Sequence, residues 1–211
     1  RPIAMLEILG RTSSINVRKV LWTCTELDLP FAQEAWGTGF RDTHAPQFLA
    51  LNPNALVPVI RDGDFVLWES NTICRYLASR APREEILPRE PEARARVEQW
   101  MAWQAGDLNT AWRYAFMALV RNSAAHTDRA AIDASAVSWN RHMAMLDAQL
   151  ARTGAFVAGD TFTLADIVLG LTVHRWLSTP IERAPLPAVH AYFEHLRARP
   201  AFGLYCRNDM P

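Results

Sequence analysis

The polar residues best placed to do chemistry begin with Ser14 and Asn16, early in this 211-residue chain, where an apolar run gives way to a helical pattern. A hydroxyl and an amide at a helix N-terminus donate hydrogen bonds, and the helix dipole there favours negative charge. No His lies nearby and no G-x-S-x-G motif occurs, so the pair suits stabilising a bound thiolate better than attacking a substrate. The alternative is that both residues only cap a helix.

A second group stands around Val57-Pro58 and Glu69-Ser70. Proline cannot donate to a strand ladder, so Pro58 belongs at a strand start or edge, and its preceding bond could be cis. The backbone of Val57 can then face a ligand. A helix beginning near Ser70 would hold a carboxylate, and Glu69 would hold an amine. Together they suit a small zwitterionic, peptide-like ligand, whereas the alternative is an ordinary hairpin followed by a capped helix.

The elements that position these residues follow from periodicity. The spacing predicts a strand near residues 3–9, a helix over 17–27 and a strand over 31–36, which together form a parallel βαβ unit. Two apolar runs around Asp62-Gly63 predict a β-hairpin, because Asp-Gly tolerates a tight turn. A helix after residue 70 completes a ββα unit.

The second half of the chain has a different pattern. Prolines and mixed charge indicate a linker over residues 81–89, and no strand pattern follows residue 70. Helical spacing predicts a long helix over 97–121 and further helices over 132–150, 164–177 and 185–199. Thr163 and Asp166 predict a capping box at the start of the third of these helices.

Composition excludes several classes of protein. The formal net charge is zero and the three cysteines are far apart, which favours neither a nucleic-acid partner nor a disulfide scaffold. No metal-ligand spacing is present, so we expect no metal. Neither an 18-residue apolar run nor a signal peptide is visible, so we expect a cytoplasmic protein with no membrane association.

The combined pattern resembles the cytosolic glutathione transferase family. The resemblance spans almost the whole chain, from Gly10 to Lys19 through Val57-Pro58 and Glu69-Ser70 to the closing run Arg199 to Phe202. It implies an α/β, thioredoxin-like N-terminal domain over residues 1–80, a linker over 81–89 and an all-α domain over 90–211. It also implies a homodimer, and the Ser14 and Asn16 pattern is similar to bacterial theta-like and nu-like members.

The resemblance assigns roles to the polar groups. Val57 and a cis Pro58 would bind the cysteinyl part of glutathione, and Glu69 with Ser70 would bind its γ-glutamyl end. Ser14 would activate the thiol and Asn16 would support the thiolate. Asp107 would reach the γ-glutamyl amine bound to the neighbouring subunit. The electrophile site would be lined by Trp112, Tyr114 and Phe116, although core packing explains these three aromatic residues equally well.

The chain departs from the family pattern before Val57. Many relatives carry Lys, Arg or Gln there to hold the glycyl carboxylate, whereas this chain has Ala55-Leu56. Candidates to replace it are Arg41, His44 and Trp36. The tyrosine of the alpha, mu and pi classes is missing, and no cysteine stands near Ser14, which disfavours beta-type or omega-type chemistry.

Three functions are open from the sequence. The leading one is conjugation of glutathione to an apolar electrophile. The second is glutathione-dependent reduction of disulfides or peroxides, which the nu-like Asn16 favours. The third is a non-catalytic glutathione-binding or scaffold protein with the same fold; Glu69 and Ser70 argue against it, and the missing basic residue leaves it open.

Overall fold

The computed structural model describes residues 5–207 and 209–211. The chain forms two compact units, one ending at Leu87 and the other beginning at Pro88. Among the residues that the structure describes, no helix is both long and apolar enough to cross a membrane.

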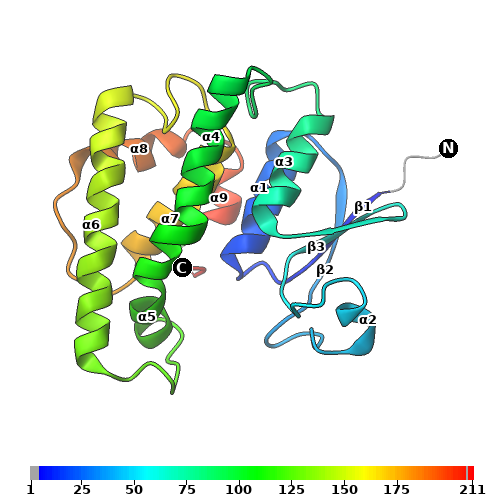
Figure 1. Ribbon diagram of the computed structural model, residues 1–211, viewed down its shortest axis with the longest axis horizontal. Coiled ribbons are helices and arrows are strands. Elements are labelled where there is room, and N and C mark those ends of the chain that lie inside the picture. Colours follow the sequence, from blue (N-terminus) through cyan, green and yellow to red (C-terminus); the bar gives the residue numbers. More distant parts are fainter. Residues whose placement is uncertain (1–4, 208) are drawn as a thin grey trace. The chain divides into compact units, whose positions relative to one another are not determined.

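The first unit is a mixed α/β structure (Figure 1). Its elements in chain order are β1 (Leu6–Leu9), α1 (Ile15–Glu26), β2 (Phe31–Glu34), α2 (Pro46–Leu49), β3 (Val59–Asp62), β4 (Phe65–Trp68) and α3 (Ser70–Arg80). The predicted βαβ and ββα arrangement is therefore confirmed.

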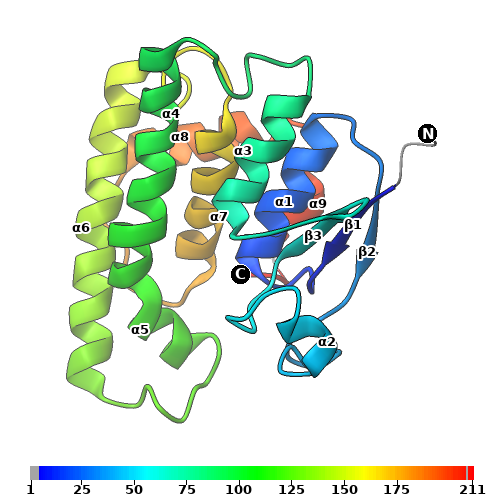
Figure 2. The same ribbon diagram turned by 45° about the vertical axis from the view of Figure 1, so that its right-hand side comes forward.

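The four strands form one sheet in the order β2-β1-β3-β4. The β1–β2 pair is parallel, and the β1–β3 and β3–β4 pairs are antiparallel. Because side chains alternate along a strand, neighbouring buried residues of β1 point to opposite faces of the sheet. Leu9 packs with Phe48 of α2 and Val59 on one face, while α1 and α3 lie side by side in Figures 1 and 2. This layering leaves the start of α1 and the start of α3 at the same end of the sheet.

The second unit is helical (Figure 2). Its helices are α4 (Pro91–Trp103), the π-helix η1 (Gln104–Leu108), α5 (Asn109–Leu119), α6 (Arg129–Thr153), α7 (Leu164–Ser178), α8 (Pro187–Leu196) and α9 (Phe202–Tyr205). The predicted single helix over 97–121 is thus interrupted by a π-helical turn, in which Gln104 donates a side-chain hydrogen bond to Asn109 at 3.0 Å. A π-helical turn inside an α-helix inserts one residue, which helical spacing in sequence does not reveal.

The capping box predicted at α7 is confirmed. The backbone N–H of Thr163 donates to Asp166 Oδ2 at 2.8 Å, and the backbone N–H of Val157 donates to Asp166 Oδ1 at 2.9 Å. Burial raises the pKa of Asp166 from 3.8 to about 6, against the opposing effect of these hydrogen bonds and that of Tyr192. The box fixes the start of the buried helix around which the second unit packs.

Candidate functional site

The β1–α1 loop places the first candidate residues. Its backbone continues the parallel ladder, because the N–H of Gly10 donates to Glu34 O and that of Arg11 donates to Trp36 O. Gly10 has a φ of +154°, and a Cβ at that position would lie 2.5 Å from Cγ2 of Val17. Only glycine therefore lets α1 approach the end of β1 this closely.

Ser14 is the N-cap residue of α1, and its side chain makes no capping hydrogen bond. The first turn of α1 contains no acidic residue, so the partial positive charge of the helix end is not neutralised there. Asn16 lies in that first turn. The hydroxyl of Ser14 is thus available to a ligand at a position that favours negative charge, as a thiolate requires.

Glu69, rather than Ser70, is the N-cap of α3, and it has a left-handed φ of +79°. Its carboxylate accepts hydrogen bonds from the backbone N–H of Asn71 at 3.2 Å and from that of Thr72 at 2.7 Å. Burial opposes ionisation of Glu69, but these hydrogen bonds and the charge of Lys19 outweigh it and lower its pKa. The site therefore keeps a carboxylate at this position near neutral pH.

The segment before β3 is the third part of the candidate site, after the β1–α1 loop and the start of α3. The Val57-Pro58 bond is cis, as predicted. Asn52 is buried and holds the backbone that leads to Val57 in place. Its amide donates to Leu56 O at 2.8 Å, and its Oδ1 accepts from Asn54 N at 3.0 Å. Val57 lies against the β1–α1 loop: its Cβ is 3.1 Å from the position that a Cβ on Gly10 would occupy.

These three segments converge in space. The hydroxyl of Ser70 donates to Oδ1 of Asn16 across 3.4 Å, which links the first turn of α3 to that of α1. The two helix N-termini, the carboxylate of Glu69 and the backbone before Pro58 thus surround one region of the first unit. Such a region can bind carboxylate and amine groups of one ligand and hold a thiolate beside α1.

The residues predicted to replace the missing basic residue differ in their surroundings. Arg41 forms an ion pair with Glu34, and its guanidinium lies 5.5 Å from the ring centroid of Trp36. The indole N–H of Trp36 is buried and donates to no described residue. His44 is exposed, and its Nδ1 lies 3.4 Å from Oδ1 of Asp42.

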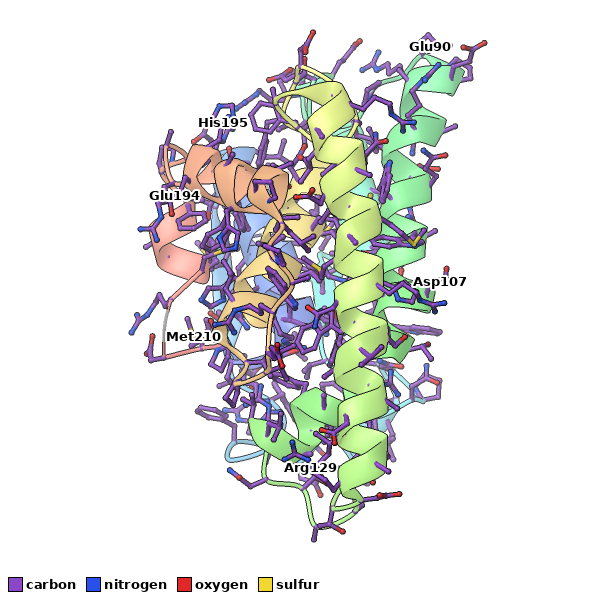
Figure 3. All side chains as sticks on the ribbon, turned by 90° about the vertical axis from the view of Figure 1, so that its left-hand side faces the viewer. Glu90, Asp107, Arg129, Glu194, His195 and Met210 are labelled. Carbon is purple, nitrogen blue, oxygen red and sulfur yellow. The ribbon has the colours of Figure 1, made fainter. Side chains whose placement is uncertain are left out.

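Predicted residues of the second unit lie on the helices that follow α4. Asp107 is exposed on η1, and Figure 3 labels it beside α6. The rings of Trp112 and Phe116 are buried and pack edge to face, 5.3 Å apart. Tyr114 is half-buried, and its ring packs on that of His126 at 4.8 Å. The assignments of all four residues stay predictions.

Thiols of the chain itself do not supply a nucleophile in the first unit. Burial raises the pKa of Cys74 to about 11, and it raises that of Cys24 further still. Both groups remain thiols at neutral pH. The described residues also contain no group of three or more His, Cys, Asp or Glu side chains that could hold a metal ion.

Three residues near the site were not identified from the sequence. Lys19 is almost fully buried and lowers the pKa of Glu69, Asn52 orients Leu56, and Arg11 lies in the same loop as Ser14. Lys19 gave one usable signal, because it is the only lysine in the chain. Asn52 acts through residues two and four positions away, within an irregular segment that has no periodic pattern. Arg11 donates to Thr38, which is distant in sequence, and no local pattern records that contact.

Comparisons with known proteins agree with this geometry. The chain matches the glutathione S-transferase N-terminal domain over residues 9–85 and the glutathione S-transferase C-terminal domain over residues 129–195. Glutathione S-transferase GstB of Escherichia coli (strain K12) is 40% identical over 199 residues, which cover 93% of this chain and 95% of that protein. The disulfide-bond oxidoreductase YfcG of the same strain is 28% identical over 197 residues, covering 89% and 88%.

A solved structure extends the likeness to three dimensions. The theta class glutathione S-transferase from the citrus canker pathogen Xanthomonas axonopodis pv. citri, with glutathione bound, aligns with a TM-score of 0.89 at 37% identity. The alignment covers 95% of this chain and 96% of that one.

Proposed function

The chain belongs to the glutathione S-transferase family, and from that premise we propose that it is a glutathione transferase whose substrate-binding residues lie on the three converging segments of the first unit. The observation that carries this assignment is the junction of the two helix N-termini, where Ser70 donates to Asn16. The N-terminus of α1, whose N-cap side chain makes no capping hydrogen bond, and the first turn of α3 face one region, which favours a ligand that carries a negative group.

Glutathione fits this region group by group. The γ-glutamyl carboxylate binds at Ser70 and the start of α3, and its amine binds to Glu69, whose pKa is lowered so that it stays charged. The cysteinyl backbone pairs with the N–H and C=O of Val57. This order places the cysteinyl sulfur toward the β1–α1 loop, since Val57 lies against Gly10.

Ser14 then acts on the sulfur. Its hydroxyl donates to the thiolate, and the N-terminus of α1 lowers the pKa of the thiol from an ordinary value of about 8.5. Asn16 supports this charge from the first turn. The thiol proton leaves to solvent, the sulfur forms a bond to the electrophilic carbon, and the leaving group departs with the electron pair.

The remaining parts of the assignment are proposals from the family resemblance. They are an apolar electrophile held against Trp112, Tyr114 and Phe116, a homodimer in which Asp107 reaches the partner's glutathione, a domain boundary within residues 81–89, and a cytoplasmic location. Of the candidates Trp36, Arg41 and His44 for the glycyl end, Trp36 is supported best, because its buried indole N–H donates to no described residue.

Reduction of disulfides is the second candidate function. It is favoured by Asn16 in the nu-like position and by the 28% identity to a protein named a disulfide-bond oxidoreductase. In that reaction the glutathione thiolate attacks a disulfide sulfur and displaces a thiolate. A higher rate with a disulfide probe than with an aryl halide would favour this function.

The proposed function is tested by the rate of glutathione conjugation to 1-chloro-2,4-dinitrobenzene. We expect Ser14→Ala to lower kcat by about 10²–10³, since a preorganised donor to a developing or bound anion has an effect of this size. Ser79→Ala, on the exposed last turn of α3, is the matched control and should leave the rate unchanged. An unchanged rate in Ser14→Ala would remove Ser14 from the mechanism.

A further inference from the structure

A hollow on the first unit adjoins the β1–α1 loop and carries one cation. It is lined by the described residues Arg11, Thr12, Ser13, Gln33, Ala35 and Phe40, and its volume is about 370 Å³. Of these residues only Arg11 has a formal charge. The hollow stands immediately before Ser14, the N-cap of α1, so a ligand in it would adjoin the proposed thiolate position.

The side chain of Arg11 is held in place without being neutralised. Its Nη1 donates to the backbone O of Thr38 at 2.9 Å, and its Nε lies 3.6 Å from the position that a Cβ on Gly37 would occupy. The buried Nε–H donates to no described residue. One fixed hydrogen bond therefore orients the guanidinium and leaves donors for another group.

Carboxylates near this loop are engaged elsewhere. Glu34, on the strand that also carries Gln33, pairs with Arg41 and Arg61. Strand alternation places Glu34 and Gln33 on opposite faces of β2, and Gln33 is the one that lines the hollow. Among the residues that the structure describes, Arg11 forms no ion pair, and α1 has no acidic residue in its first turn.

The floor and rim of the hollow are also suited to a ligand. The amide of Gln33 donates to Gly10 O at 2.8 Å and to Thr12 Oγ1 at 3.0 Å, which holds the loop in one conformation. Phe40 stands at the rim with 60% of its surface exposed. The hollow thus offers a cation at one point and an apolar ring nearby.

We propose that Arg11 binds a carboxylate of a substrate held beside Ser14. A guanidinium pairs with a carboxylate through two parallel N–H donors, and this geometry makes it a specific carboxylate receptor. The carboxylate is either the glycyl carboxylate of glutathione or an acidic group on the second substrate. The inference rests on the proposed function and adds an acidic-group specificity to it.

The test compares charged and neutral versions of each substrate. Arg11→Gln, Arg11→Lys and wild type are assayed with glutathione or its glycyl monoethyl ester, against 4-chloro-3,5-dinitrobenzoate or the matching benzamide. Arg129→Gln, which removes a side chain that is 81% exposed on α6, controls for the loss of one positive charge. Circular dichroism and thermal unfolding establish that each variant is folded.

The pattern of losses identifies the source of the carboxylate. A loss of about tenfold to a hundredfold in kcat/KM with the benzoate but not with the benzamide assigns Arg11 to the second substrate. A similar loss with glutathione but not with its ester assigns it to the glycyl carboxylate. Arg11→Lys should recover part of the loss in either case, because it keeps the charge without the paired donors.

An equal effect on charged and neutral substrates, or no effect in a folded Arg11→Gln variant, would overturn the proposal. Dissociation constants for glutathione, its ester, 3,5-dinitrobenzoate and 3,5-dinitrobenzamide are measured in parallel by calorimetry. They decide the role of Arg11 even if the wild type proves to bind without turnover, a result that would count against the proposed function alone.

Discussion

The hydroxyl of Ser70 and the side-chain oxygen of Asn16 lie 3.4 Å apart, although 54 residues separate them in the chain. This contact joins the first turns of α1 and α3, and both helices present their N-termini to the region assigned to glutathione. Asn16 therefore has a role in positioning Ser70 as well as in supporting the thiolate.

The contact predicts coupling between the two residues. Asn16→Ala should raise the KM for glutathione about fivefold, since one hydrogen bond contributes about 1 kcal/mol. In a double-mutant cycle with Ser70→Ala, the two effects should not add, because each variant removes the same contact. Steady-state kinetics at saturating electrophile measure both terms, and strictly additive effects would show that the residues act independently.

We expect the β1–α1 loop to be destabilised by any side chain at position 10. In Gly10→Ala the new methyl group would lie 2.5 Å from Val17, at a backbone φ of +154°. We expect a loss of about 1–3 kcal/mol in the free energy of unfolding, because a well-packed site cannot accept an added carbon without displacement. Urea denaturation measures it. Gly203→Ala, with open space around it, is the matched control, and equal stability of the two variants would refute the clash.

Much of the fold follows from local signals that do not depend on distant residues. The hairpin around Asp62-Gly63, the cis bond before Pro58 and the capping box of Thr163 and Asp166 are each set by a few adjacent side chains, and all three are confirmed. The turn of the hairpin itself is Gly63-Asp64, because Asp62 ends β3 and pairs with Phe65. The family match confirms the thioredoxin-like unit followed by a helical domain.

Other features depend on tertiary packing and were not predictable in the same way. The π-helical turn at η1 keeps helical spacing on either side, so the sequence suggests a single helix. Glu69 replaces Ser70 as the N-cap because the chain takes a left-handed conformation there, which a non-glycine residue does not signal. Arg11 joins the site only because Thr38, 27 residues away, accepts its hydrogen bond.

Glu69 predicts an acid-dependent loss of stability. Its pKa in the folded chain is lowered from 4.5, so its contribution is complete above pH 4.5 and is lost as the pH falls through the folded-state pKa. The difference in unfolding free energy between wild type and Glu69→Gln should therefore shrink on acidification. Chemical denaturation at pH 7 and pH 3.5 tests this, and a difference that does not depend on pH would contradict it.

The contribution of Asp166 to the free energy of unfolding should depend on pH with the opposite sign. Its folded-state pKa is raised from 3.8 to about 6, so the folded chain holds a proton that the unfolded chain has released. This contribution is complete below pH 3.8 and falls by roughly 3 kcal/mol as the pH rises through 6. Carbon-13 NMR of labelled aspartate carboxyls should show one midpoint near 6, assigned by its loss in Asp166→Asn. Titration of every aspartate below pH 4.5 would contradict the account.

The central claim, that the junction of α1 and α3 binds glutathione, is tested most directly by calorimetric titration of glutathione at pH 7. The wild type and the Ser79→Ala control should bind in the sub-millimolar range, and Ser70→Ala should lose most of this affinity while remaining folded at the temperature of the titration. Equal binding by wild type and a folded Ser70→Ala variant, or no binding by the wild type, would contradict the assignment of this region.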